Sequence, residues 1–293
     1  MAETDVIRDK KIVNAIKQFI KEKKEKDKLN IAFPNSLLKD DALELLDRYC
    51  TVVYYPLENE KNNGFHITNV PDKNGEVRQF VFINTAQTME KQVFTAAHEL
   101  GHIWEVDEYV ARKCNIHLNN ELREHIINRF AAELLIPEEQ FVKMFTSEYA
   151  NLAKENGKIS IVNMLRLIAR LMNFFFVPMK SVVLRFSELQ IIDDEVKELL
   201  LGRGEVQERL IQDKLNDIII EDGYTKISNS SNKKWIDGLA EMLDKAEASK
   251  ALPEMKINRM RAAFNLPSKT NENDLDSTVE LNLSKEDDIC NEN

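Results

Sequence analysis

The sequence has little glycine and proline, with 8 and 7 of its 293 residues. All-β folds, collagen-like chains and low-complexity chains need many more of both, so these classes are excluded. Cysteine is equally scarce, because only Cys50, Cys114 and Cys290 occur. An odd number of widely spaced cysteines gives no disulfide framework and is typical of a reducing compartment, so we expect a cytoplasmic protein.

Long apolar runs and an excess of positive charge are also missing. The N-terminal segment MAETDVIRDKK lacks the apolar stretch of a signal peptide, and no run approaches the roughly 18 apolar residues of a membrane helix. The net charge is −10, which disfavours non-specific binding to DNA or to an anionic membrane. We therefore expect neither a membrane partner nor a nucleic-acid partner.

Apolar residues make up 43% of the chain and charged residues 31%, so most of it is expected to fold. Helical spacing of apolar residues predicts helices over 8–28 and 36–49. Three segments rich in β-branched and aromatic residues, with turn-rich sequence between them, predict a three-stranded antiparallel meander. These predicted strands are 51–57, 64–70 and 78–84. From about residue 88 the helical period returns, and we expect helices to follow one another to residue 264.

Two stretches interrupt this pattern. Residues 223–233 (GYTKISNSSNK) have the composition of a linker. Residues 266–293 carry eight acids and two bases and no aromatic residue. Such a composition buries too little apolar surface to offset the entropy of ordering the chain, so it predicts a disordered acidic tail.

The segment His98-Glu99-Leu100-Gly101-His102 carries the strongest chemical signal. Chance would place roughly 0.01 copies of the pattern H-E-x-x-H in a chain of this composition. Residues four apart lie on one face of a helix, so His98 and His102 can present two imidazoles to one Zn²⁺ ion. Glu99 stands about 100° further around the helix, from where its carboxylate can serve as general base for a water beside the metal.

A third ligand is needed, and a site with two histidines and one carboxylate leaves a coordination position open, as catalysis requires. The acidic, histidine and cysteine side chains that follow are all candidates: Asp107, Glu108, Cys114, His117, Glu121, Glu124, His125 and Glu133. The helix predicted over 119–135 favours Glu124, which shares a face with Asn128 and then with small alanines. Alanines would let the HExxH helix approach, and a carboxylate at the end of that face could then reach the imidazoles.

The runs FTAAHELGHIW and EHIINRFAAELLIP resemble the ImmA/IrrE-type metallopeptidases. The resemblance covers roughly residues 36–190. In that family the third ligand is the Glu four residues before the Asn of the second run, which implies Glu124, with Asn128 as the matching Asn. The resemblance also implies hydrolysis of a peptide bond with one Zn²⁺ per chain. The protein substrate it implies is a partner transcriptional repressor of the helix-turn-helix type.

We therefore expect an α+β fold. It would have a zincin-like core with a small antiparallel three-stranded sheet and flanking helices, and an all-helical C-terminal extension. The parts we expect are an N-terminal helix (1–35), the metallopeptidase core (36–150), a helical extension (151–222), the linker (223–233), a helical segment (234–265) and the acidic tail (266–293).

Two other functions remain open at this stage. The same fold could bind a regulator without cutting it, as a scaffold would. The helix pair 160–172 and 178–189 could instead be a DNA-binding helix-turn-helix, although Lys180 and Arg185 are the only bases on its second helix. For the enzyme, His125, Arg129 and Tyr55 are the candidates for stabilising the oxyanion, and the pattern does not choose among them.

Overall fold

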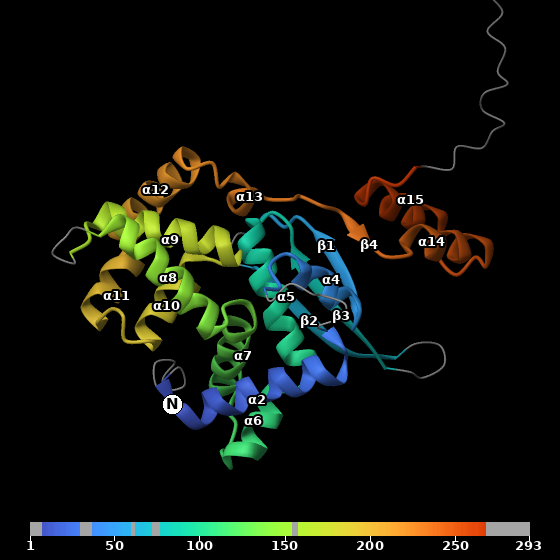
Figure 1. Cartoon of the computed structure of the whole chain (residues 1–293). Coiled ribbons are helices and arrows are strands. Elements are labelled where there is room, and N and C mark those ends of the chain that lie inside the picture. The colour runs from blue at the N-terminus through green and yellow to red at the C-terminus, as the bar shows by residue number, and fades with distance from the viewer. Residues whose placement is uncertain (1–7, 30–36, 60–61, 72–76, 154–157, 268–293) are drawn as a thin grey trace, which may run out of the picture. The chain divides into compact units, whose positions relative to one another are not determined.

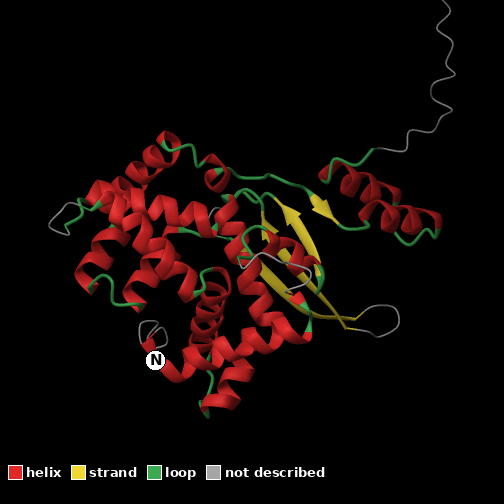
Figure 2. Ribbon diagram, in the orientation of Figure 1, coloured by secondary structure: helices red, strands yellow, loops and turns green. Residues whose placement is uncertain are grey.

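The computed structural model describes residues 8–29, 37–59, 62–71, 77–153 and 158–267. Helices dominate these residues, together with one small sheet, so the fold class is α+β as predicted (Figures 1 and 2). The chain divides into two compact units, Met1–Asp237 and Gly238–Asn293. The described residues end at Pro267. Of the acidic tail predicted over 266–293, only Leu266 and Pro267 are therefore described, and the rest of that prediction lies outside the described residues.

The first unit holds the sheet and most of the helices. Its elements are α2 (Lys10–Lys26), α4 (Asp41–Asp47), β1 (Thr51–Tyr55), β2 (Gly64–Pro71), β3 (Val77–Asn84), α5 (Met89–Ile103), α6 (Val106–Cys114), α7 (Asn120–Leu135), α8 (Glu138–Leu152), α9 (Ile161–Phe175), α10 (Met179–Glu188), α11 (Asp194–Leu201), α12 (Glu205–Glu221), α13 (Thr225–Ser228) and β4 (Trp235–Ile236). The second unit contains α14 (Leu239–Ala248) and α15 (Glu254–Ala263).

The sheet corrects the predicted three-stranded antiparallel meander. It has four strands in the order β2-β3-β1-β4. The strand β3 pairs antiparallel with β2 but parallel with β1, and β4 pairs antiparallel with the other edge of β1. Alternation of apolar residues shows which face of a strand is buried but not which strand lies beside it. The two residues of β4 are too few to show any period.

The sheet lies against α5. Four side chains on its inner face are almost fully buried, namely Val52, Tyr54, Val81 and Ile83. The register pairs Val52 with Val81 and Tyr54 with Ile83, so these side chains form one continuous apolar surface. Helix α5 contacts β2 and β3 on this side and α4, α6 and α7 elsewhere. It is therefore held by packing along its whole length.

Helices α5 and α7 approach each other closely at Gly101. A Cβ atom at this position would lie 2.9 Å from Cδ1 of Phe130 and 3.0 Å from Cγ2 of Ile127. Both partners are fully buried, and protein interiors are close-packed, so an added Cβ atom would push against the core. The glycine of the HELGH segment therefore sets the short distance between the two helices that carry the candidate ligands.

We expect the substitution Gly101→Val to lower the free energy of unfolding by at least about 2 kcal/mol, because the added side chain overpacks the α5–α7 contact. Urea denaturation of the metal-free protein measures this without a contribution from metal binding. A matched control is Lys113→Val, an exposed position on α6, where a change of less than about 0.5 kcal/mol is expected. Equal stability of the two variants would show that the contact is not tight.

Helices α8 to α12 form the helical part that follows Pro137. The apolar helix α9 contacts α8, α10 and α12, and Phe175 and Phe176 at its end are buried in the core. These two side chains therefore pack in the core. No single helix in the described ranges is long and apolar enough to cross a membrane. Among the described residues, α9 and α10 are long and apolar enough only when they are taken together, and their axes are bent by 104° relative to each other.

Besides β4, two helices do not appear among the predicted elements. Helix α6 begins directly after Glu105, whose left-handed backbone (φ 53°) separates it from α5, and nine residues show too little period to be recognised. The second is α13, which lies within the expected linker 223–233. This segment is hydrogen-bonded to the start of α5, since Met89 N donates to Asn229 O at 3.0 Å and Ser231 Oγ donates to Gln92 Oε1 at 3.0 Å. The division into six parts stays a prediction.

Candidate metal centre

The structure brings the three predicted ligands together. His98 and His102 lie on one face of α5, and Glu124 reaches them from the second turn of α7. The two Nε2 atoms are 3.1 Å apart. One carboxylate oxygen of Glu124 lies 3.4 Å from Nε2 of His98, and the other lies 3.5 Å from Nε2 of His102. Among the described residues this is the one group of three or more potential metal-ligating side chains.

These separations fit a zinc ion. Ligands at about 2.0–2.1 Å from a tetrahedral zinc lie roughly 3.3–3.4 Å from one another. The two Nε2 atoms, 3.1 Å apart, are close to that value, and each imidazole lies 3.4 or 3.5 Å from a different oxygen of Glu124. With one donor atom taken from each side chain, the three atoms lie within 4.8 Å of one another. Two imidazole nitrogens and one carboxylate oxygen also match the donors that zinc takes in catalytic sites. That these three residues are ligands stays a prediction, and their geometry supports it.

The start of α7 is fixed so that Glu124 faces α5. The Asn119 side chain caps the helix by accepting a hydrogen bond from Leu122 N at 2.7 Å. Next to Glu124, the Arg123 guanidinium forms ion pairs with Asp107 and with Glu108, the latter at 2.6 Å. Both acids belong to α6, so the first turns of α7 are tied to the helix that follows α5.

Asn128 orients the first histidine. Its Oδ1 accepts a hydrogen bond from Nδ1 of His98 at 2.9 Å. A histidine that donates from Nδ1 keeps a lone pair on Nε2, the atom that faces His102 and Glu124. Partners of this kind fix the tautomer and the ring orientation of metal-binding histidines. Asn128 lies one helical turn after Glu124, so α7 supplies both a predicted ligand and the residue that holds another.

We expect Asn128→Ala to weaken zinc binding by about 10–100-fold, because His98 loses the acceptor that selects its tautomer. Competition with a coloured chelator measures the affinity. Asn128→Asp is the matched variant, since its carboxylate can still accept from Nδ1, and it should retain most of the affinity. Unchanged affinity in the alanine variant would show that Asn128 does not orient the site.

The charges at the site are coupled. Burial lowers the pKa of His98, but the hydrogen bond and charge of Glu124 together with the charge of Glu99 raise it above its usual value. The pKa of Glu124 is lowered in turn, first by its contact with His98. Burial and the charge of His98 lower the pKa of His102. Zinc needs both imidazoles neutral, so binding displaces protons and affinity should fall as the pH falls.

Glu99 is buried beside the histidines, with 5% of its surface exposed. Burial, opposed by the charge of His98 and assisted by that of Glu124, raises its pKa to about 7. Its Oε2 atom is buried and has no hydrogen-bond partner among the described residues. A carboxyl group with a pKa near neutrality and an unused oxygen is suited to accept a proton and return it.

A cavity of about 400 Å³ opens at this point, and we call it the metal-site cavity. It is lined by Asn59, Asn62, Asn63, Gly64, Phe94, Thr95, His98, Glu99 and Asn128. One wall comes from the segment leading into β2, and the other comes from α5 and α7. An open space beside His98 and Glu99 gives a substrate access to both.

The other candidate ligands lie elsewhere. Asp107 and Glu108 are paired with Arg123, and Glu133 is paired with two arginines. Cys114 is the half-buried last residue of α6, and burial raises the pKa of its thiol, whereas His117 is exposed. Among the described residues neither Cys114 nor His117 belongs to a group of three possible ligands.

The candidates for an oxyanion donor are also placed. The Arg129 side chain forms ion pairs with Glu133 and Glu188, and Tyr55 at the end of β1 has the Lys234 ammonium over its ring at 5.3 Å. His125 lines a second cavity next to the metal-site cavity, and its buried Nδ1 has no partner among the described residues. The oxyanion donor stays unassigned.

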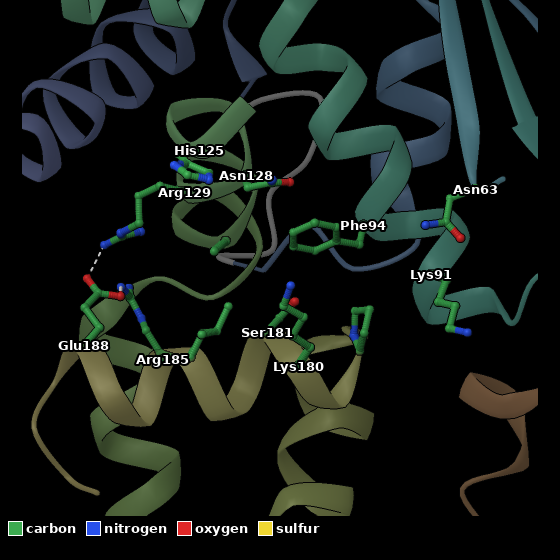
Figure 3. Close-up of a pocket in the computed structure, with 13 residues that line it drawn as sticks. Asn63, Lys91, Phe94, His125, Asn128, Arg129, Lys180, Ser181, Arg185 and Glu188 are labelled. Atoms are coloured by element: carbon green, nitrogen blue, oxygen red, sulfur yellow. Dashed lines mark hydrogen bonds and ion pairs between the residues drawn. The ribbon is translucent and has the colours of Figure 1, made fainter. Parts of the chain in front are cut away.

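The sequence did not reveal a buried ion network behind the site. It consists of Arg129 and Glu133 on α7 and Arg185 and Glu188 on α10, of which Arg129 and Glu188 are seen in contact in Figure 3. The Arg185 guanidinium lies 3.0 Å from Glu133 and 2.6 Å from Glu188, and it donates to Ile136 O at 2.7 Å. Burial raises the pKa of Glu133, but Arg185 and Arg129 outweigh it and hold the pKa below its usual value.

Comparison with known families identifies the part of the chain that contains these residues. Residues 47–187 match the family Peptidase_M78, described as the IrrE N-terminal-like domain. The matched segment runs from the end of α4 into α10 and includes β1, β2, β3, the three predicted ligands, and Arg129, Glu133 and Arg185 of the ion network. The resemblance to the ImmA/IrrE-type peptidases is thereby confirmed over these residues, and it indicates a metallopeptidase. No curated protein sequence matches this chain.

Proposed function

We propose that the IrrE-like segment, residues 47–187, is a zinc-dependent endopeptidase domain. One observation carries the proposal: two imidazoles and a carboxylate converge within 3.5 Å of one another, next to a buried glutamate, at an open cavity. His98, His102 and Glu124 would hold the metal. When bound, zinc supplies Lewis acidity towards the scissile carbonyl and eases the deprotonation of water.

The residues of the chain perform the proton transfers. Glu99 accepts a proton from the water molecule that attacks the carbonyl carbon. The Glu99 carboxyl group then passes this proton to the leaving amine. Asn128 keeps the His98 ring in place during these steps through its hydrogen bond to Nδ1. The half-buried side chains of Phe94 and Asn128 line the cavity beside Glu99, where the peptide would bind.

The substrate we propose is a partner transcriptional repressor, which this domain would cut at one or very few sites. The resemblance to ImmA/IrrE-type peptidases supports this proposal. A physical argument adds to it, since a peptidase that shares a compartment with other proteins must be restrained by its groove, by low activity or by a required partner surface. The DNA-binding alternative is weakened by Arg185, which is buried and paired in the ion network and leaves Lys180 as the one exposed base on α10.

The test is to incubate the zinc-loaded full chain separately with casein and with helix-turn-helix repressors encoded near its gene. We expect one repressor to yield two discrete fragments and casein to stay intact. The Glu99→Gln variant is the control for a contaminating protease. Rapid digestion of casein would point to a general peptidase, and tight binding of a repressor without any cleavage would favour the non-catalytic module.

A further inference from the structure

A second cavity, of about 340 Å³, adjoins the metal-site cavity, and we call it the side cavity. It lies between α5, α7 and α10, as Figure 3 shows. Asn63, Phe94 and Asn128 line both cavities. A peptide with its scissile bond at Glu99 would therefore have this space beside it, within reach of a neighbouring side chain.

The walls of the side cavity are apolar and come from three helices. Phe94 belongs to α5, Ala132 to α7 and Leu184 to α10, and Pro178 caps the start of α10. All four side chains are only half-buried when no ligand is bound. Figure 3 shows the Phe94 ring between α7 and α10. Apolar surface that remains exposed inside a cavity gains most from covering by another apolar group.

Charged residues at the base of the cavity are already compensated. Arg129, Arg185 and Glu188 line it, and with Glu133 they make up the buried ion network of two positive and two negative groups. These charges sum to zero, so the network adds no net charge to the cavity, although Nε and Nη1 of Arg129 and Nε of Arg185 are buried without a hydrogen-bond partner among the described residues.

We propose that the side cavity receives a large apolar side chain of the substrate, from a residue next to the scissile bond. The inference rests on the proposed peptidase function and adds a preference for the sequence that is cut. An acidic side chain is the rival occupant, because the exposed Lys91 and Lys180 also line the cavity. The apolar walls and the neutral base favour the apolar one.

The test uses three hydroxamates that share one backbone and differ in one side chain: methyl, isobutyl or carboxymethyl. A hydroxamate binds to the metal without being hydrolysed, so calorimetric titration of the zinc-loaded full chain reports occupancy of the cavity without any need for turnover. We expect the isobutyl probe to bind at least about tenfold more tightly than the methyl probe. The carboxymethyl probe should bind no more tightly than methyl.

Two variants place the preference at this cavity. Ala132→Leu fills the space and should reduce the isobutyl advantage to less than about threefold, with the methyl probe unaffected. Leu184→Ala removes part of a wall and should weaken the isobutyl probe alone, by about threefold or more. Ala150→Leu, the same change as the first at an exposed position on α8, is the matched control and should behave as wild type. Zinc content and melting temperature verify that each variant is folded.

The outcomes separate the inference from the function on which it rests. If no probe binds, the metal site itself is wrong and the inference fails with it. If the methyl probe binds but isobutyl gains nothing, or if Ala132→Leu keeps the full preference, the side-cavity inference is overturned and the peptidase proposal stands. Tightest binding of the carboxymethyl probe would show that Lys91 and Lys180 select an acidic residue instead.

Discussion

Replacing Glu99 with Gln should lower the rate of peptide-bond cleavage by about 10²–10⁴-fold and leave the zinc content unchanged. The amide of glutamine has nearly the same shape as the carboxylic acid but cannot accept the proton of the attacking water. Because Glu99 is not a ligand in this account, its substitution should not affect zinc affinity. The buried position of Glu99, with 5% of its surface exposed, also makes the near-isosteric change preferable to alanine.

The measurement is the initial rate on the repressor substrate, taken together with metal analysis of the same protein sample. Glu121→Gln is the matched control, because it removes a carboxylate from an exposed position on α7, one turn before Glu124. It should cleave at the wild-type rate. An undiminished rate in Glu99→Gln would reject the proposed mechanism, and loss of zinc from that variant would make Glu99 a ligand.

The second large effect concerns the three predicted ligands. His98→Ala, His102→Ala and Glu124→Ala should each weaken zinc binding by more than about 100-fold, because a coordinating group is lost rather than a partner of one. Each should also abolish cleavage. Chelator competition gives the affinity, and wild-type protein should bind about one zinc per chain.

Variants of the rejected candidates are the controls for this series. Cys114→Ala and His117→Ala should bind zinc as wild type does, since both residues lie outside the ligand group. If Glu124→Ala kept its zinc while either of these lost it, the assignment of the third ligand would be wrong. Glu124 is the informative position, because its side chain is about half exposed (53%) and its loss leaves no buried cavity.

Much of the site could be predicted because its spacing is local. His98 and His102 are four positions apart, and helix geometry alone places them on one face. Glu124 was predicted from a second helical face with small alanines, and it lies within 3.5 Å of both imidazoles. Gly101 completes the explanation, because its missing side chain lets α7 come close enough to α5. The HELGH segment thus contains the two predicted histidine ligands and the glycine that leaves room for α7, which carries the third predicted ligand.

What could not be predicted depends on contacts between distant segments. The parallel pairing of β1 with β3 and the addition of β4 follow from how the chain returns to the sheet, which the period of a strand does not encode. Arg185 has the sequence appearance of a solvated base on an amphipathic helix, yet it is buried against Glu133, 52 residues earlier in the chain. The side cavity has the same origin, since its walls are assembled from three separate helices.

X-ray absorption spectroscopy of the zinc-loaded full chain tests the central claim most directly. The account predicts a four-coordinate zinc with two imidazole ligands and only nitrogen and oxygen donors, at about 2.0–2.1 Å. In Glu124→Ala the spectrum of any remaining zinc should change, because one protein oxygen is missing. A sulfur donor at about 2.3 Å, or a spectrum without imidazole scattering, would contradict a metal centre built from His98, His102 and Glu124.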